Sequence, residues 1–506
     1  MNKGKPSRLR HMSMYRFALV LLSLWGFILV LRMTSLPGIS KERIKVRTQR
    51  TVDVGESWYK EVLRLLGNST DPLEISGEDL LHLSLLHEFC VQDVEASLTW
   101  EFGSPGHQLP NASASNPEVV MRLNDDNLLQ KLRQCPDVEI FLPTTLRENG
   151  YCEDAVAYVK YLKSRLLHEW ALVVKVFDPA LNREVDYFDL CPKTPIIFFN
   201  HNWYGAQLAL RWPKDKPIYM MPNLDMSELE PKHFWSVDAV LCRTKDCFDR
   251  VTRWYDQEGN PRDAKVFYTK HTSSDHAHFA RKRYGEVAIR PKNFSDVKFI
   301  HTAGTSLTKG TEELLKCWVY LPGLPPLDVY IDELPLVSLT TPTLRRMIPY
   351  SRSPLKIHVG LVERSAFAKL IAEAALFMCP STSEGYGHYI NQARAAGAVV
   401  LTSDLAPMNE LISNESGILI PVTSPKNPLK LMVGAYEVEN GLMDVDGHVA
   451  SFKGSDIFDV VQEFIMSTTT EQRAAMGDKA RQAYHQDTRF FAIAMQELRR
   501  FARHGK

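Results

Sequence analysis

The dominant feature of this chain is a regular alternation of short apolar runs with longer amphipathic stretches, in two consecutive series. The runs of the first series lie at residues 138–143, 171–177, 195–200, 217–222, 238–242 and 264–268, and those of the second at 297–303, 327–331, 355–359, 375–379 and 398–403. Continuous apolar runs this short suit strands that are buried on both faces. Alternated with helices, they predict parallel sheets built from β-α-β units.

Two series of this kind indicate two open α/β domains. A polar stretch at residues 281–295 separates the series. We therefore expect two doubly wound, parallel-sheet domains, at residues 76–290 and 291–455, followed by C-terminal helices at 456–506. A chain of 506 residues, 44% of them apolar, is long enough to fill both cores.

Local patterns place several other elements. Apolar residues recur at helical spacing over residues 76–100, and the stretch at 153–170 is amphipathic, so both are expected to be helical. The segment 103–117 is rich in Gly, Pro, Ser and Asn and predicts a surface loop.

The overall charge excludes one class of partner. Lys plus Arg (60) equals Asp plus Glu (60), so no global field favours nucleic acid. A negatively charged substrate must therefore be held by a local site.

The N-terminus carries an uncharged apolar run at residues 17–31. The stretch 15–33 is long enough to span a bilayer. A cleaved signal peptide is the alternative, but Arg32 follows the run where a small-residue cleavage site would be needed. We therefore expect an uncleaved transmembrane signal anchor, with a cytosolic tail at 1–14 and a stem at 34–75.

Flanking charges bear on the orientation of this anchor. Basic residues before the run favour a cytosolic N-terminus and a lumenal body, and they are Lys3, Lys5, Arg8, Arg10 and Arg16. Basic residues also follow the run, so a body on the cytosolic side of the endoplasmic reticulum stays open. Sequons at Asn68, Asn111, Asn293 and Asn414 suit a lumenal glycoprotein. The expectation is a single-pass type II membrane protein of the Golgi, with the endoplasmic reticulum as the alternative.

The eight cysteines are too few for a disulfide scaffold, and no close pair has zinc-site spacing. Cys242 and Cys247 flank a predicted strand end and are interpreted as buried thiols. Cys135 and Cys152 could pair in a lumenal chain, although sequence alone does not determine the pairing.

Two strand-to-helix junctions in the second domain have the chemistry of an anion site. In the first, Gly304 permits a close turn, Thr305, Ser306 and Thr308 supply hydroxyls, and Lys309 precedes a helix. Ligands of open α/β sheets bind beyond the carboxyl ends of strands, where helix N-termini attract anions. Lysine is a point charge suited to a diphosphate. Alone, this pattern is more commonly that of a surface lysine at a helix start.

The second junction follows the run at 375–379 with the hydroxyl-rich segment 380–383. Glu384, Gly385, Tyr386 and Gly387 then open a helix near His388, and glycines there leave backbone amides free to bind an anion or sugar hydroxyls. Gln392 lies about two helical turns after Glu384, so both can face one ligand. A glycine N-cap is the simpler reading for any one of these residues, but the combination with the next strand favours a site.

These segments resemble the donor domain of retaining GT-B fold glycosyltransferases, the group with glycogen synthase-like and mannosyltransferase enzymes (glycosyl transferases group 1, family four-like). The resemblance covers residues 301 to about 421 and the final helices. It implies a GT-B fold, and C-terminal helices that pack back on the first domain. It also implies a nucleotide-sugar donor in the second domain, an acceptor bound on the side of the first, and no other cofactor and no metal.

Carried over by position, the resemblance implies that Lys309 holds the donor diphosphate and that Glu384 meets the transferred sugar. Donor-binding residues would be Gly304, Thr305, Lys309, Ser383, Glu384, Gly385, Tyr386, Gly387 and Gln392. Gln392 stands where the family usually has a second Glu, and Thr305 stands where it has an Arg. Both departures favour an alternative, a non-catalytic glycan-binding or scaffold protein that keeps the fold.

The first domain matches less closely. Residues 195–212 resemble the strand-loop-helix in which a family histidine lies near the donor sugar, which implies a catalytic role for His201 beside Lys309 and Glu384. A histidine at a strand end is by default a structural hydrogen-bonder. Asn223 and Asp225 follow the next strand, and a polar loop within 268–279 follows the last.

The predicted reaction is metal-independent, anomer-retaining hexosyl transfer from a nucleotide sugar to a glycan, glycoprotein or lipid-linked acceptor. A rival is a metal-dependent transferase of the other major fold, which needs an Asp-x-Asp metal site after a strand. The triplet at Asp444 and Asp446 lies in a polar loop late in the chain, which argues against that rival.

Overall fold

The protein is described here by a computed structural model. It describes residues 58–66, 75–104, 119–147, 150–200, 212–225, 228–426, 430–433 and 439–504. All of these belong to one compact unit, Gln49–Lys506. The predicted anchor at 15–33, the expected loop tip at 105–117 and the candidate residue His201 lie outside the described residues.

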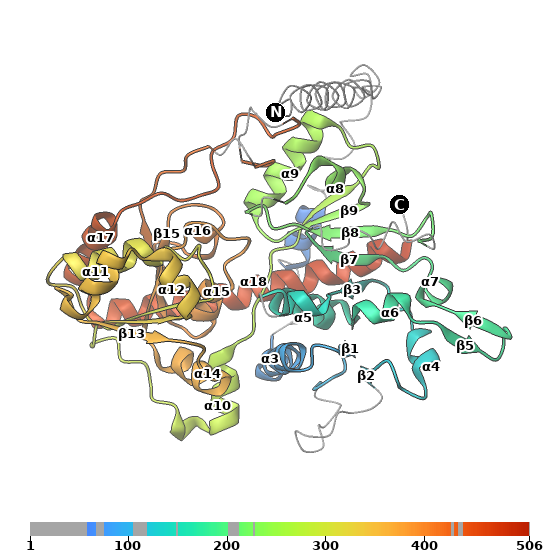
Figure 1. Ribbon diagram of the computed structural model, residues 1–506, viewed down its shortest axis with the longest axis horizontal. Coiled ribbons are helices and arrows are strands. Elements are labelled where there is room, and N and C mark those ends of the chain that lie inside the picture. The colour runs from blue at the N-terminus through green and yellow to red at the C-terminus, as the bar shows by residue number, and fades with distance from the viewer. Residues whose placement is uncertain are drawn as a thin grey trace, which may run out of the picture. The chain divides into compact units, whose positions relative to one another are not determined.

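The first α/β domain is built on an eight-stranded sheet (Figure 1). Six strands are parallel, in the order β10-β9-β8-β7-β3-β4, and β1 and β2 extend one edge antiparallel. The strands are β1 (Ser97–Thr99), β2 (Val120–Met121), β3 (Glu139–Phe141), β4 (Arg165–Leu167), β7 (Ile196–Phe199), β8 (Ile218–Met221), β9 (Ala239–Cys242) and β10 (Lys265–Tyr268). The strand order reverses between β3 and β7, which opens a crevice at their carboxyl ends.

The second domain has a six-stranded, wholly parallel sheet in the order β13-β12-β11-β14-β15-β16. Its strands are β11 (Phe299–Gly304), β12 (Leu327–Ile331), β13 (Leu355–Val359), β14 (Leu376–Cys379), β15 (Val399–Ser403) and β16 (Gly417–Ile420). This is the doubly wound order 3-2-1-4-5-6, with its reversal between β11 and β14. The two junctions singled out in the sequence are the carboxyl ends of these two central strands.

Helices cover both faces of each sheet. In the first domain they are α3 (Gly77–Gln92), α4 (Leu128–Leu132), α5 (Tyr151–Leu162), α6 (Glu169–Val173), α7 (Tyr187–Leu190), α8 (Pro231–Trp235) and α9 (Lys245–Glu258). The next helix, α10 (His276–Tyr284), packs into the core of the second domain. The second domain and the C-terminus contain α11 (Thr311–Tyr320), α12 (Glu333–Leu339), α13 (Pro342–Met347), α14 (Arg364–Glu373), α15 (His388–Ala395), α16 (Met408–Leu411), α17 (Gly454–Ser467) and α18 (Thr470–His504).

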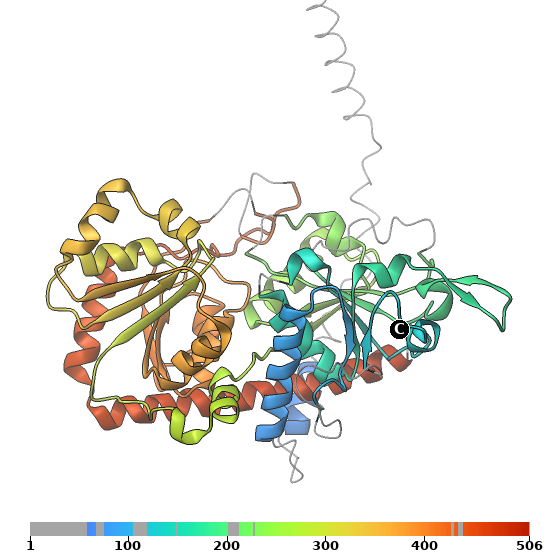
Figure 2. The same cartoon turned by 60° about the horizontal axis from the view of Figure 1, so that its bottom comes forward.

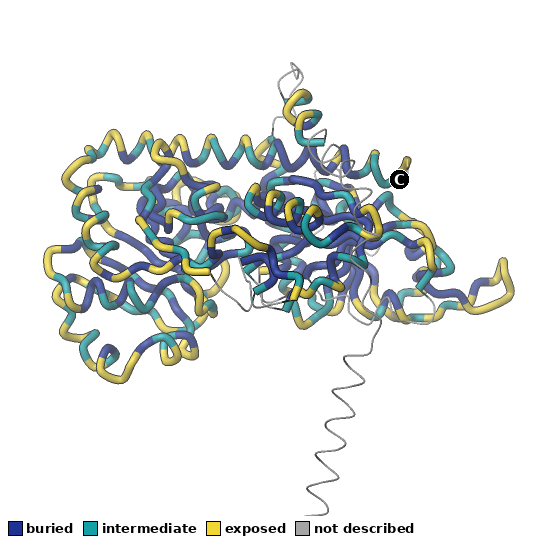
Figure 3. The backbone as a smooth tube through the Cα atoms, turned by 90° about the horizontal axis from the view of Figure 1, so that it is seen from above, coloured by how far each residue is buried: buried dark blue, intermediate teal, exposed yellow. Residues whose placement is uncertain are grey.

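The C-terminal helix α18 runs along both domains (Figure 2). Near its start, Gly477 lies so close to Gly397 of the second domain that a Cβ would come within 2.4 Å of the Gly397 carbonyl oxygen. Further along, Phe490 and Phe491 are buried in the core of the first domain. Figure 3 shows the resulting pattern, with buried residues on the helix face toward the body and exposed ones outside. One helix therefore stabilises both domains.

The structure confirms most of the predicted strands and corrects three assignments. The helix expected over residues 76–100 ends at Gln92, and residues 97–99 form strand β1. The run at 171–177 is not a sheet strand: it forms the end of α6 and β5 (Val176–Asp178), which pairs only with β6 (Arg183–Val185). The stretch 153–170 is not one helix, because α5 ends at Leu162, its C-cap residue Lys163 adopts φ 50°, and β4 follows at once. The strands β1, β2, β4, β6 and β16 were not anticipated.

The expected localisation, a single-pass type II protein of the Golgi membrane, is corrected. Within the described ranges no helix is long and apolar enough to cross a bilayer. The longest, α18, has 35 residues but carries charged side chains along its length, including Arg473, Lys479 and Arg489. Such charges oppose burial in lipid.

The cysteines pair differently from the sequence-based interpretation. Three disulfides join Cys90 to Cys152, Cys135 to Cys191, and Cys242 to Cys247. Cys135 and Cys152 therefore have other partners, and Cys242 and Cys247 are not free thiols. Cys317 and Cys379 are free and buried.

Candidate functional site

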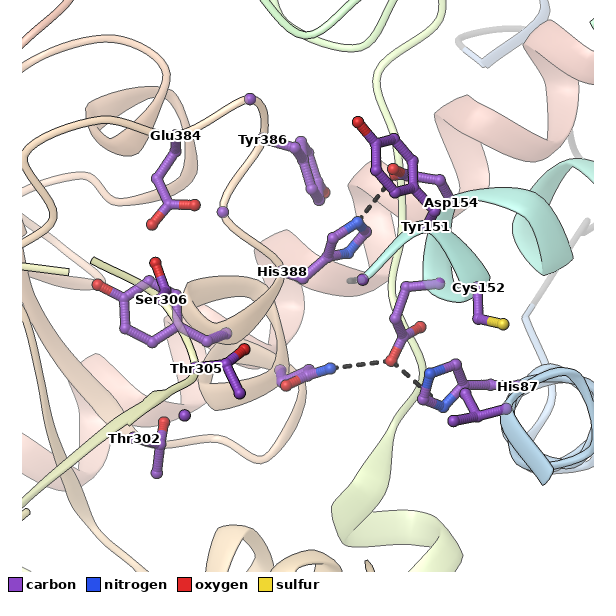
Figure 4. A pocket seen from close by; sticks show the side chains of 18 of the residues that line it. His87, Tyr151, Cys152, Asp154, Thr302, Thr305, Ser306, Glu384, Tyr386 and His388 are labelled. Atoms are coloured by element: carbon purple, nitrogen blue, oxygen red, sulfur yellow. Dashed lines mark hydrogen bonds and ion pairs between the residues drawn. The ribbon is translucent and has the colours of Figure 1, made fainter. Parts of the chain in front are cut away.

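A cavity of about 790 Å³ lies at the carboxyl ends of the two sheets, lined by residues of both domains. From the second domain come the end of β11, the loop before α15 and the first turns of α14 and α15. From the first domain come α3, the start of α5 and the loops after β8 and β9, and the start of α10, which packs against the second domain, completes the lining. Figure 4 shows side chains of this pocket from close by. Such a position is where open α/β sheets bind their ligands.

The two second-domain loops of the predicted site contact each other. The amide of Thr382 donates a hydrogen bond to the carbonyl oxygen of Thr308 (2.7 Å). Gly310 adopts φ 67°, and a Cβ there would lie 1.9 Å from the carbonyl oxygen of Pro380. Only glycine permits this approach. The junctions after β11 and β14 therefore form one surface.

Lys309 and Glu384 form an ion pair on this surface, with 2.5 Å between Nζ and Oε1. The Lys309 Nζ also lies 3.9 Å from the ring centroid of Tyr389, a cation–π contact. Ser381 donates its hydroxyl to Glu384. Both members of the pair line the cavity and are held by neighbours, so the lysine charge is positioned before any ligand binds.

The start of α15 presents backbone amides to the same cavity. Gly387, the N-cap residue, adopts φ 104° and provides no side-chain cap. The first amides of a helix have no partner within the helix, and together with the helix dipole they attract anions. Gly385 lies against the first domain, because a Cβ there would come within 2.3 Å of the Asn223 side-chain oxygen.

Most of the remaining predicted site residues line the same cavity. Gly304, Thr305, Gly385, Tyr386, Gly387 and Gln392 line the cavity, as do Asn223 and Asp225 of the first domain. Ser383 does not line it and is buried. Tyr386 is also buried and donates its hydroxyl to the carbonyl oxygen of His271 (2.9 Å), so it packs the two domains together.

Gln392 makes a contact that the sequence did not indicate. Its side-chain amide donates to Glu153 on α5 of the first domain (2.9 Å). Glu153 also accepts hydrogen bonds from the amide and hydroxyl of Ser274 (2.9 and 2.8 Å). Burial raises the pKa of Glu153, whereas His87, other histidines and the Ser274 amide lower it, with a net fall to about 2.

A second buried acid, Asp154, joins the domains. It forms an ion pair with Arg243, and His388 at the start of α15 lies 2.8 Å from it (Figure 4). Burial opposes its charge, but Arg243 and His388 outweigh this and hold the pKa of Asp154 well below its ordinary value. His271 lies 3.0 Å from the same carboxylate, and burial lowers the pKa of His271 to about 4.

The sequence contained a signal for these acids. Glu153 and Asp154 lie in the first turn of the helix that follows β3, a strand at the topological reversal of the first sheet. The rule applied to β11 and β14 would have selected them. Arg243, directly after β9, follows the same rule.

The Asp-x-Asp triplet lies outside the lining of this cavity. The backbone carbonyl oxygens of Asp444 and Asp446 accept hydrogen bonds from Arg253 and Arg250 on α9. Neither aspartate lines the cavity.

Comparison with known proteins gave one family match. The sequence model of a family described as Glycosyl transferases group 1 matches residues 342–434. This segment contains β14, the loop before α15, and α15 itself, but not Lys309. No curated protein matches the chain.

Similar solved structures are transferases and synthases at low identity. TarM is 14% identical over 64% of this chain, which spans 60% of TarM, with a TM-score of 0.41. Sucrose-phosphate synthase from Thermosynechococcus elongatus is 14% identical over 62% of this chain and 73% of its own, with a TM-score of 0.41. HepE from Anabaena, in complex with UDP and glucose, is 16% identical over 60% of this chain and 76% of its own, with a TM-score of 0.38.

Proposed function

We propose that this protein is a glycosyltransferase that moves a hexose from a nucleotide sugar to a glycan, glycoprotein or lipid-linked acceptor, with retention at the anomeric carbon. The observation that carries the proposal is the convergence of Lys309 and the uncapped start of α15 on one interdomain cavity. A positive side chain and free amides at neighbouring strand ends are suited to a diphosphate. The family match over residues 342–434 supports the same reaction class.

The leaving group is stabilised by fixed groups of the second domain. As the bond between sugar and phosphate breaks, negative charge builds on the departing phosphate. Lys309 and the amides of the loop before α15 would meet this charge, and Glu384 would orient the lysine and contact the sugar. One preorganised donor of this kind is typically worth about 3 kcal/mol in a transition state. The departure of the nucleoside diphosphate therefore needs no metal.

Retention follows if the acceptor hydroxyl approaches the face from which the nucleotide leaves. The hydroxyl oxygen forms the new bond to the anomeric carbon, and its proton passes to the departing phosphate oxygen. The acceptor would enter from the first-domain wall, where Asn223 and Asp225 lie.

Contacts between the domains hold the two walls of the cavity together. His388 reaches Asp154 (2.8 Å), and Glu410 of the second domain accepts hydrogen bonds from the amides of Lys245 and Asp246 (2.6 and 2.8 Å). A closed arrangement of the domains limits hydrolysis of the donor.

The test is a donor screen on the purified full chain. Uridine, guanosine and adenosine diphosphate sugars are supplied, and the released nucleoside diphosphate is measured. We expect one donor to be hydrolysed slowly without acceptor and turned over faster with a glycan acceptor. Absence of turnover with every donor, in a protein that unfolds cooperatively on heating, would contradict the proposal.

A non-catalytic glycan-binding function is the second candidate, and one contact favours it. The Gln392 amide is engaged by Glu153, and Thr305 supplies no charge near Lys309. Calorimetry separates the two functions, because a transferase binds a nucleotide sugar whereas a non-catalytic glycan-binding protein binds only the glycan.

A further inference from the structure

Two histidines and one carboxylate form a cluster in the cavity wall where α10 meets the first domain, and the proposed sugar transfer does not use them. His87 comes from α3, Glu153 from α5 and His276 from the first turn of α10, and all three line the cavity. One donor atom of each lies within 4.8 Å of the other two. We propose that these three side chains bind a divalent transition-metal ion, with Zn²⁺ preferred.

The distances in this cluster fit a shared ion better than direct hydrogen bonds. His87 Nδ1 and His276 Nε2 lie 3.6 and 3.7 Å from the same oxygen, Glu153 Oε1. Both separations are too long for a hydrogen bond. Ligands about 2.0–2.2 Å from a tetrahedral Zn²⁺ are about 3.4 Å apart, so both nitrogen–oxygen separations are close to those of two ligands of one ion.

The ligand types select a transition metal over Mg²⁺ or Ca²⁺. Neutral imidazole suits Zn²⁺, Cu²⁺, Fe²⁺ and Ni²⁺, whereas the hard cations require oxygen ligands. Burial lowers the pKa of His87 to about 4 and also lowers that of His276, so both rings are neutral near pH 7. Arg364 lowers both pKa values through its charge and opposes a cation here, whereas the Glu153 carboxylate attracts one.

Neighbouring contacts hold the carboxylate ready for an ion. Ser274 donates two hydrogen bonds to Glu153 Oε2, which leaves Oε1 toward the histidines. Oε1 accepts one hydrogen bond from Gln392 and retains a second lone pair. The disulfide between Cys90 and Cys152 joins α3 to α5 beside His87 and Glu153. Hydrogen bonds of this kind orient metal ligands and tune their affinity.

A neighbouring cluster with the same composition is less suited to a cation. Asp154, His271 and His388 also lie within 4.8 Å of one another. However, the Asp154 oxygen that faces both histidines already forms an ion pair with Arg243. A metal ion would have to displace that guanidinium.

An ion bound to the first cluster would link three helices. It would attach α10, which packs against α14 of the second domain, to α3 and α5 of the first. We therefore expect the ion to stabilise the domain pair. With three protein ligands, the fourth position remains open to water or an oxygen ligand in the cavity.

The test measures binding and stability of the untagged full chain with Zn²⁺ alone, so its outcome is independent of sugar transfer. Calorimetry and thermal unfolding are compared for the natural protein, His87→Ala and Glu153→Gln. Glu153→Gln keeps the side-chain shape, and His87→Ala changes a partly exposed residue. If either variant fails to fold, the other still tests the proposal. The matched control is His278→Gln, which removes another histidine of α10.

We expect one Zn²⁺ per chain and a rise in Tm of about 5 °C at about 100 times Kd. His87→Ala and Glu153→Gln should each weaken binding at least about tenfold and remove the rise in Tm, while His278→Gln keeps both. No saturable binding, or equal binding in all four proteins, would overturn the proposal.

Discussion

The side-chain amide of Gln392 donates a hydrogen bond to Glu153 across the interdomain cavity, with 2.9 Å between Nε2 and Oε1. Gln392 belongs to α15 of the second domain and Glu153 to α5 of the first. An amide in this position satisfies a buried carboxylate without adding a second negative charge. One of the two residues that depart from the resembled family, Gln392, therefore makes a contact with the opposite domain.

The first prediction concerns Gln392→Glu. This change places two carboxylates in contact in a buried position, where like charges repel strongly. We expect a lower Tm than that of Gln392→Ala, which loses only the hydrogen bond. Thermal unfolding of both variants at pH 7.5 measures the difference. Equal Tm values would show that the contact does not exist in solution.

The strand pattern predicted the two-domain fold and the part of the site that belongs to the second domain. Continuous apolar runs identified every strand of the second sheet except β16, and the junctions near Lys309 and Glu384 do lie together. The run 171–177 was wrongly predicted as a strand of the main sheet. An apolar sequence this short is also compatible with the end of a helix followed by a strand of a separate two-stranded sheet. The boundary of α5 was missed because a single left-handed residue, Lys163, ends it without Gly or Pro.

The rest of the site depends on contacts between distant segments. Glu153 and His87 are separated by many residues and come together only when α3 packs on α5, a contact secured by the Cys90–Cys152 disulfide. Cysteine pairing is not determined by sequence spacing. The engagement of Gln392 depends likewise on how the domains meet.

A second prediction tests the donor site. Lys309→Ala and Glu384→Ala should each lower transfer at least tenfold, because the first removes the charge that meets the departing phosphate and the second removes its orienting partner. Both variants should stay folded, since the pair lies at a cavity wall. Lys316→Ala is the matched control, a lysine of the following helix that pairs with Glu313 at the surface. Near-normal turnover in both site variants would refute the assignment.

A third prediction concerns the disulfides. Thiol titration of the denatured, unreduced protein should find two free thiols, those of Cys317 and Cys379. Replacing Cys90 and Cys152 by Ala should cost more stability than replacing Cys242 and Cys247, because the first bond closes a loop of 62 residues and the second a loop of 5. Denaturant unfolding measures both. A larger loss for the short loop would contradict the reasoning.

The fourth prediction is a pH dependence caused by His301 on β11. Burial lowers its pKa to about 4, and its nitrogens bond the Met378 carbonyl oxygen and the Thr311 hydroxyl (2.7 and 2.8 Å). In the unfolded chain the histidine takes up a proton near pH 6.5, whereas in the native state it does so only near pH 4. The native state therefore loses stability as the pH falls from 6.5 to 4, by up to about 3 kcal/mol.

Equilibrium unfolding of the natural protein and His301→Gln at pH 7, 5.5 and 4.5 checks this. The variant should be less stable at pH 7 but should lose less on acidification. Parallel curves for the two proteins would rule out His301 as a source of the acid sensitivity.

The last prediction concerns Gly385, where the second domain meets the first. A Cβ at this position would lie 2.3 Å from Asn223 Oδ1 and 3.0 Å from the Arg243 guanidinium. Asn223 cannot move aside freely, because Arg243 donates to that oxygen and the amide nitrogen of Asn223 lies 3.5 Å from the Tyr151 hydroxyl.

We therefore expect Gly385→Ala to push the loop before α15 away from the first domain and to lower turnover at least tenfold. Adding Asn223→Ala removes the closest clash, so the double variant should recover part of the loss, which steady-state kinetics at saturating donor would detect. If the activity losses of the two single variants simply multiply in the double variant, the two residues act independently. That result would show that they are not in contact and that the domains meet differently.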